Sequence, residues 1–300
     1  MTYTSTLINK GKWRTDRADN FGEVVDYLTA SPCAWGDQQW ASSRRPKESK
    51  FNITDTYEQA IGLARTGWPE GRQKMVAGLD ASRLINQQAR IKSEELDVAG
   101  AYPMVPAFIA GVPDCMVNIG EAEIAGTQII RIVVNISFVA GVYDSTVINR
   151  GVAILSWVDR LEAEGKRVEL IALRSTEGMS SATVNRFSLM FPLKRADEPL
   201  EIDRAAFVLA HPDMLRRLMF SASESHADMK EGFESTQGRS SNYEPDDWKV
   251  PHSIYFNALR SEDENRNYNS IPKACETVEA IIQAGLTQEQ AQEEETPDGA

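Results

Sequence analysis

The chain has 300 residues, of which 42% are hydrophobic and 25% are charged, a composition typical of soluble globular proteins. Its formal net charge of −12 opposes broad binding to nucleic acid, and the best basic segment, residues 42–50 (SSRRPKESK), is short and has no interleaved aromatic residues. We therefore expect no nucleic-acid partner. Three widely separated cysteines, Cys33, Cys115 and Cys275, indicate free thiols in a reducing compartment.

Two hydropathy features argue against export and membrane insertion. The N-terminal residues contain no apolar core of the length found in signal peptides. The longest apolar stretch, residues 129–143, is interrupted by Arg131 and Asn135 and is shorter than the roughly 20 residues that a bilayer crossing requires. We expect a cytoplasmic protein without a membrane span.

The first third of the chain predicts helices. Residues 20–31 have apolar side chains on one helical face and stop before Pro32. Asp55 is expected to cap a second helix that ends at Gly67, and a third helix is expected from Pro69 to about Ile91. An apolar segment rich in Gly and Pro, residues 97–119, is typical of a buried connection. Residues 1–119 are thus expected to be a mainly helical portion docked on the core.

From residue 120 the pattern alternates between strands and helices. The expected strands are residues 129–135, 166–174, 181–194 and 252–259, the third of them an antiparallel edge strand closed by Pro192. The expected helices are residues 149–164, ended by Gly165, two helices hinged at Pro212, and residues 272–284, ended by Gly285. Residues 227–249 are expected to be an exposed loop, and residues 286–300 a disordered acidic tail.

This alternation predicts an α/β domain over residues 120–285, with a mainly parallel, Rossmann-like sheet flanked by helices. Ligands of such sheets bind beyond the carboxyl ends of the strands. The first strand ends at Asn135, followed by Ser137 and by a polar loop that leads into a helix. This strand end is therefore the candidate functional site.

The order of strand, Asn-x-Ser, polar loop, helix and strand resembles the von Willebrand factor A domain family, whose metal-dependent adhesion motif is Asp-x-Ser-x-Ser. By this resemblance Asn135 stands at the position of the aspartate and Ser137 at that of the first serine, while Val139 replaces the second serine. Thr176 could stand for the threonine that a later loop contributes in the family. No residue matches the family's final aspartate.

The departures from the motif change its expected chemistry. A hard cation such as magnesium is held by oxygen ligands that usually include carboxylates, whereas Asn135 is neutral and Val139 offers no oxygen. We interpret Asn135 and Ser137 as residues that cap the turn and bind loop amides, so that no cofactor is expected. The alternative is a rearranged magnesium site made of Asn135, Ser137, Thr176 and Asp144, the last supplying a displaced carboxylate.

A second resemblance covers more of the chain. The segments TDTYEQAIGLARTGWPEGRQKM, DVAGAYPMVPAFIAGVPDCM and LAHPDMLRRLMF are similar to those of a protein family of tailed bacteriophages. The resemblance implies a phage or prophage origin and synthesis in the cytoplasm of a bacterial host. It implies no activity and no catalytic residues.

Catalytic and metal-binding patterns are otherwise sparse. The chain has no Gly-x-Ser-x-Gly elbow and no Gly-rich phosphate loop. We expect His211 to cap or pack at the helix hinge, and Glu224, His226 and Asp228 to lie on a solvated helix end rather than around a metal. The resulting hypothesis is a non-enzymatic protein that acts through contacts with another protein. Two alternatives stay open: a metal-dependent binder or enzyme that uses the rearranged site, and a virion component.

Overall fold

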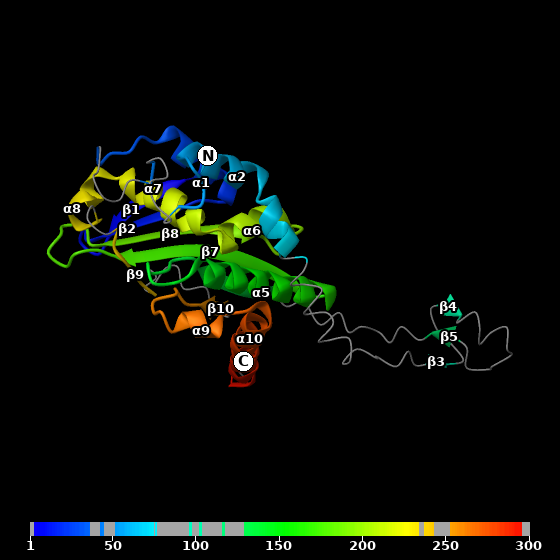
Figure 1. The fold of residues 1–300 in the computed structure, drawn as a ribbon. Helices are drawn as coiled ribbons and strands as arrows, with labels where there is room; N and C mark the ends of the chain where they lie inside the picture. The colour runs from blue at the N-terminus through cyan, green and yellow to red at the C-terminus, as the bar shows by residue number, and fades with distance from the viewer. Residues whose placement is uncertain are drawn as a thin grey trace. The chain divides into compact units, whose positions relative to one another are not determined.

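The computed structural model describes residues 3–36, 43–44, 52–74, 76, 96–97, 102–103, 116–117, 129–233, 237–242 and 253–295 (Figure 1). The chain divides into two units, one made of Met1–Asp80 with Ile129–Ala300 and the other of Ala81–Gln128. This division differs from the expected boundary after residue 119, because the N-terminal residues up to Asp80 belong to the same unit as the main sheet.

The N-terminal residues form two strands that the sequence pattern did not predict. β1 (Thr4–Ile8) and β2 (Trp13–Arg17) pair antiparallel in a hairpin. The turn between them has left-handed backbone at Asn9, Lys10 and Gly11, and this conformation favours Gly and is tolerated by Asn. β1 is exposed along nearly its whole length, so its residues carry no alternation of apolar and polar side chains that could mark a strand.

The first two helices are close to their predicted positions. α1 (Phe21–Ala30) is capped by the side chain of Asn20 and buries its predicted apolar face. α2 (Tyr57–Thr66) is capped by Thr56 rather than by Asp55, because the hydroxyl of Thr56 and the side chain of Gln59 form a reciprocal capping box. Gly67, with a φ of 88°, ends α2 as predicted.

The central strands and their connecting helix follow in the predicted order. β6 (Ile129–Asn135) leads into α5 (Asp144–Ala163), and β7 (Arg167–Glu177) and β8 (Arg186–Lys194) follow. The helix begins five residues before the expected position, so that Asp144 lies in its first turn. Gly165, with a φ of 83°, provides the predicted left-handed stop.

The last third of the chain contains more regular structure than expected. Its elements are α6 (Ile202–Ala210), the π-helix η2 (Met214–Met219), α7 (Phe220–Glu224), the 3-10 helix η3 (Ala227–Met229), α8 (Lys230–Phe233), β9 (Arg239–Ser240), β10 (Ser253–Phe256), α9 (Glu264–Asn267) and α10 (Ile271–Glu295). The expected exposed loop at 227–249 is wrong in its first part, because Met229 and Phe233 are fully buried. α10 continues through Gly285, so the expected disordered tail is helical as far as Glu295.

The main sheet has seven strands, with the order β1-β2-β8-β7-β6-β10 and with β9 paired to β7 beside that path. β6 is parallel to β7 and β10, and β2 is parallel to β8, whereas β8 and β9 are antiparallel to β7. The predicted α/β sheet flanked by helices is confirmed, but the sheet is mixed rather than mainly parallel. The connection from β7 to β8 is short and contains no helix, so β8 must run antiparallel to β7. This pairing accounts for part of the mixed character of the sheet. β8 is not the expected edge strand, since β2 pairs with its other side.

One large apolar core joins the sheet to the helices. Helices α1, α2, α5, α6, α7 and α10 contribute to it together with alternate residues of β6, β7, β8 and β10. A smaller cluster on the opposite face of the strands consists of Val133, Ile171 and Leu173, with Met190 and Tyr255 beside them. The core thus packs along β6 from Ile130 to Val134 and fixes the position of the strand end that carries the candidate site.

The second unit contains a small antiparallel sheet of three two-residue strands, in the order β3-β5-β4. They are β3 (Leu96–Asp97), β4 (Tyr102–Pro103) and β5 (Met116–Val117). The expected buried connection at residues 97–119 otherwise lies outside the described residues. In the part of the chain that the structure describes, no helix has both the length and the apolar character needed to cross a membrane.

Candidate functional site at the carboxyl end of β6

Asn135, the last residue of β6, has a fully buried side chain that is bonded on both sides. Its Oδ1 accepts a hydrogen bond of 3.1 Å from the backbone N–H of Ser137, which forms the predicted Asx-type cap. Its Nδ2 donates a bond of 2.8 Å to the backbone carbonyl of Ser241, just beyond β9. The amide therefore ties the end of β6 to the segment that leaves β9.

The hydroxyl of Ser137 forms hydrogen bonds with the backbone of β7 at a position where β6 has ended. The last backbone bond on the β6 side runs from Ile136 N to Leu173 O, and on the β9 side the pairing of Thr176 with Ser240 is extended by a bond from Ser241 N to Ser175 O. Between these points the Ser137 Oγ donates to the carbonyl of Ser175 and accepts from its N–H, with 3.1 Å in each case. One side chain thus bridges the gap between two strands that share the same edge of β7.

Thr176 also serves the junction with β9. Its Oγ1 lies 3.2 Å from the carbonyl oxygen of Gln237 and 3.1 Å from that of Arg239, and it donates toward both. Between them Gly238 has a φ of 79°, and a Cβ at this position would lie 2.3 Å from the Thr176 Oγ1. Gly238 is therefore required both for the left-handed turn and for its close approach to the threonine.

The carboxylate of Asp144 is paired with an arginine. Its Oδ1 forms an ion pair of 2.9 Å with Nη1 of Arg216, whose side chain is 5% exposed. The guanidinium of Arg216 in turn lies 5.1 Å from the centre of the Phe138 ring, a cation–π geometry. The structure thus joins Asn135, Ser137 and Thr176 in one junction around β7 and β9, while the carboxylate of Asp144 has a different partner.

Arg150 is a further residue of this candidate site, and it was not predicted from the sequence. It projects from α5, is 5% exposed, and donates from Nη1 to the carbonyl of Asn135 at 3.1 Å and from Nη2 to the carbonyl of Asn257 at 2.8 Å. Burial lowers the pKa of its guanidinium, while Tyr268 is the strongest of the neighbours that raise it. The sequence feature that could have revealed this residue is an arginine in the middle of the apolar face of a predicted helix.

The position of Arg150 decides whether a metal ion fits. A divalent cation at this site would meet a neutral amide and hydroxyl groups that are already bonded within the fold. It would also lie near a guanidinium charge that is bonded to the backbone of Asn135 itself. Because carboxylates must offset the charge and dehydration of such an ion, these residues do not fit magnesium. Within the described ranges, no group of three His, Cys, Asp or Glu side chains could hold a metal.

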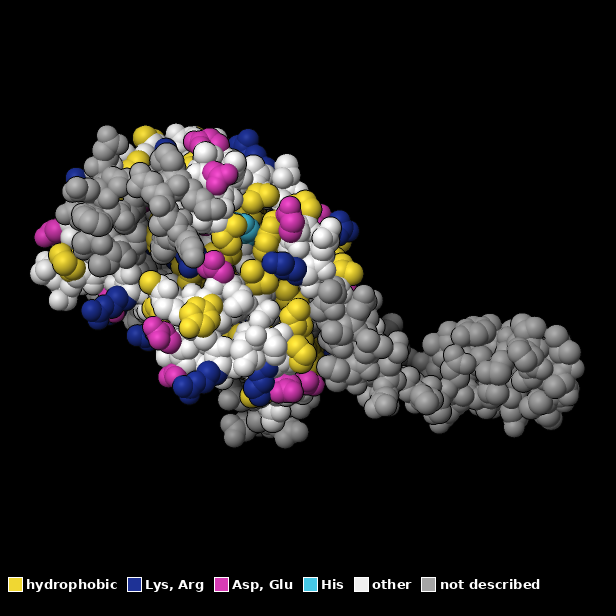
Figure 2. Space-filling model, viewed as in Figure 1, with side chains coloured by type: hydrophobic (Ala, Val, Ile, Leu, Met, Phe, Trp, Pro, Cys, Tyr) yellow, Lys and Arg dark blue, Asp and Glu magenta, His cyan; other side chains and the backbone are white. Residues whose placement is uncertain are grey.

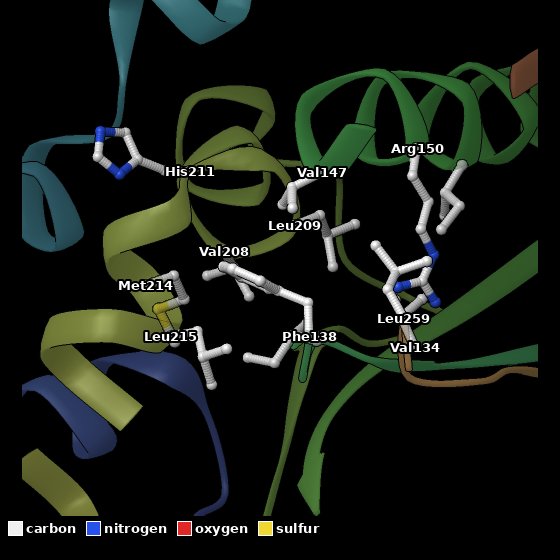
Figure 3. A pocket seen from close by; sticks show the side chains of 12 residues that line it. Val134, Phe138, Val147, Arg150, Val208, Leu209, His211, Met214, Leu215 and Leu259 are labelled. Carbon is white, nitrogen blue, oxygen red and sulfur yellow. The ribbon is translucent and has the colours of Figure 1, made fainter. Parts of the chain in front are cut away.

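A small pocket lies beside Arg150, between α5, α6, η2 and the loop after β6 (Figure 3). Its open volume of about 10 Å³ corresponds to a single water molecule, and apolar side chains such as Phe138, Leu209 and Leu259 form most of its wall. His211 also lines it. Burial lowers the pKa of His211 to about 4, and its Nδ1 accepts a bond of 3.1 Å from the N–H of Asp213, so the imidazole is neutral at pH 7. The predicted packing role of His211 is confirmed.

A second polar cluster contradicts the expected solvated helix end at Glu224, His226 and Asp228. Glu224 is fully buried and accepts bonds from the N–H and hydroxyl of Ser43 at 2.9 and 2.6 Å and from Gln237 Nε2 at 2.7 Å. Burial raises the pKa of its carboxyl group. His226 is paired with buried Asp16 at 2.7 Å, and Asp228 is paired with Arg14. The three residues face three separate partners, since the spacing of two sends their side chains in different directions.

Comparison with known proteins places the chain in one family. Residues 8–287 match a family described as a domain of unknown function (DUF7192), and the chain belongs to this family. The match spans β2 to α10 and includes both units. A search of curated proteins gave no significant match, and neither did a search of solved structures.

Proposed function

We propose that this protein is non-enzymatic and acts by binding another protein, and that its strand end has an architectural role. The observation that carries the proposal is the guanidinium of Arg150 on the carbonyl of Asn135, which supplies an internal cation at the strand end where the alternative hypothesis places a magnesium ion. The side chain of Asn135 is hydrogen-bonded to the residue that follows β9, and that of Ser137 is hydrogen-bonded to β7. The parallel unit of β6, α5 and β7 supports the proposed likeness to the von Willebrand A domain.

The proposed origin is a tailed bacteriophage, and the proposed compartment is the cytoplasm of the bacterial host. Both rest on the segments that resemble phage proteins. A protein made during infection could act on either a host protein or a phage protein. The experiment described below therefore uses lysate from infected cells, which contains both.

The proposed contact surface surrounds Tyr143, the last residue of the loop between β6 and α5. Tyr143 is 67% exposed, while its backbone N–H donates to Asn265 Oδ1 at 2.9 Å, and the same oxygen accepts from the Thr146 hydroxyl at 2.7 Å. An exposed aromatic side chain on a fixed base is the kind of residue that anchors protein interfaces, because little conformational entropy is lost on binding. On the face shown in Figure 2, apolar side chains gather centrally and acidic and basic groups are intermixed.

The test is affinity capture by the immobilised full chain from lysate of infected cells. The wild-type chain and a Met179→Ala variant should retain the same partner, and Tyr143→Ala should lose most of it. Met179 is the matched control because it is also apolar and 49% exposed. A partner retained equally by all three chains would contradict the proposed surface. A catalytic turnover measured for the purified chain would contradict the non-enzymatic role.

The magnesium-binding and virion alternatives are tested separately. A rise in the melting temperature with millimolar magnesium that disappears in Asp144→Ala would favour the metal-dependent alternative over our proposal. Mass spectrometry of purified phage particles tests the virion alternative. A virion component must be present in stoichiometric amount, so absence of the protein from the particles would exclude it.

A further inference from the structure

We propose that β1 is a docking edge that adds an extended strand of a partner protein, and that acidic residues beside that strand bind Lys10 and Lys12. β1 is the terminal strand of the seven-stranded sheet, and β2 is its partner in the sheet. Four of its five residues are exposed, including Leu7 at 44%. Alternate residues of such a strand direct N–H and C=O groups outward, where an added strand can pair with them.

The edge lacks three of the features that commonly prevent strand addition. Residues Thr4–Ile8 include no proline and no charged residue, and their register with β2 runs without a bulge. Sheet edges are commonly protected by one of these features, because an unprotected edge pairs readily with other chains. The edge is therefore available in the part of the chain that the structure describes.

The inner side of β1 is held in place by buried polar contacts. The Tyr3 hydroxyl and the Ser5 hydroxyl each donate a bond of 2.5 Å to the carboxylate of Asp16 on β2, and His226 lies 2.7 Å from the same carboxylate. Asp16 itself is fully buried. A strand fixed in this way loses little entropy when a second strand pairs with it.

The charge of the hairpin selects the kind of partner. Between Thr4 and Arg17 the chain has four basic residues and one acidic residue, although the whole chain has a net charge of −12. Lys10 and Lys12 are exposed at the turn, directly after β1, and neither forms an ion pair with another residue of the described ranges. Two acidic groups of the sheet are already engaged, since Asp16 on β2 accepts from Tyr3 and Ser5 and Glu177 on β7 is paired with Arg186. An acidic extended segment therefore meets uncompensated positive charge at one end of the edge.

A strand fits this surface better than other ligands. Nucleic acid would use the lysines but not the backbone groups of an uncharged edge, and pairing with β1 of a second copy of this chain would bring one basic hairpin against another. The edge is separated from the strand end of β6 by β2, β8 and β7 in the sheet order. This proposal and the proposed surface around Tyr143 can therefore fail independently.

The test uses two fluorescent peptides with the full-length chain. Both have a centre of alternating Val and Thr, and one is flanked by Glu residues at each end while the other is flanked by Lys. We expect the Glu-flanked peptide to bind about tenfold more tightly by fluorescence anisotropy, and the variant Lys10→Glu/Lys12→Glu to reverse the preference. The control Arg266→Glu/Lys273→Glu also reverses two exposed basic residues and should preserve the preference.

A second pair of measurements distinguishes strand pairing from simple charge attraction. The Glu-flanked peptide with N-methyl groups on alternate residues keeps its charge but cannot donate to β1, so its affinity should fall about tenfold. Equal affinity for the methylated and unmethylated peptides would overturn the proposal. So would tighter binding of an oligothymidylate, or a sedimentation velocity experiment in which the chain alone is a dimer that Leu7→Lys separates.

Discussion

The substitution Ser137→Ala tests whether one hydroxyl group completes the sheet between β6 and β9. Ser137 is 2% exposed, and alanine removes both the bond that its hydroxyl accepts from Ser175 N and the bond that it donates to Ser175 O. The carbonyl of Ser175 keeps the N–H of Ser241 as a donor at 3.0 Å. The main loss is therefore the hydroxyl acceptor of a buried N–H. Loss of a buried hydrogen-bonding partner costs about 1–3 kcal/mol, so we expect a decrease of about 2 kcal/mol in the free energy of unfolding.

This decrease is measurable by urea denaturation at pH 7, followed by tryptophan fluorescence and by far-ultraviolet circular dichroism. In a thermal scan the same change corresponds to a melting temperature lowered by roughly 4–8 °C. Ser180→Ala is the matched control, because Ser180 is exposed in the connection between β7 and β8. If the two variants unfold at the same urea concentration, the bridging role assigned to Ser137 is wrong.

Three further substitutions have defined outcomes. Asn135→Asp should lower the free energy of unfolding by about 2 kcal/mol, because a buried donor is lost, and millimolar magnesium should not restore the melting temperature while Arg150 is present. His211→Phe should flatten the acid side of the stability profile. The folded chain binds fewer protons than the unfolded chain between pH 6.5 and about 4, so stability falls as the pH is lowered through this window, by up to about 3 kcal/mol, in wild type only. Gly165→Val should cost about 1 kcal/mol in urea denaturation through backbone strain alone, because no atom lies within 4 Å of the added Cβ.

Residue patterns with local physical causes were sufficient to predict several elements. The apolar face of α1, the glycine stops at Gly67 and Gly165 and the hinge before Pro212 depend on neighbours within a few positions, and the structure has each of them. Asn135 as a cap for Ser137 N is local in the same sense. Sequence reasoning therefore succeeded at most positions where the partner of each group lies within about one helical turn, but it failed at Gly285, through which α10 continues, and placed the cap of α2 one residue too early.

Features that depend on distant partners were not predictable in this way. The polar strand β1 is a strand because β2 pairs with it, and β2 is positioned by β8, far along the chain. Glu224 is typical of a solvated helix end by composition, yet Ser43 and Gln237 satisfy its oxygens in the interior. Arg150 is a further case, since its acceptors are backbone carbonyls, which have no residue-type signature.

The long sequence separation of these contacts has a consequence for protein synthesis. Asn135 binds a carbonyl 106 residues later, and Asp16 binds the imidazole of a residue 210 positions later. While the chain emerges from the ribosome, β6, β7 and β8 can pair early, but the last residues of β7 lack their β9 partner until residue 240 has been made, and the N-terminal hairpin lacks β8 until residue 194 has been made. The nascent protein thus displays unpaired strand edges for most of its translation, and chaperones that shield such edges should raise its yield.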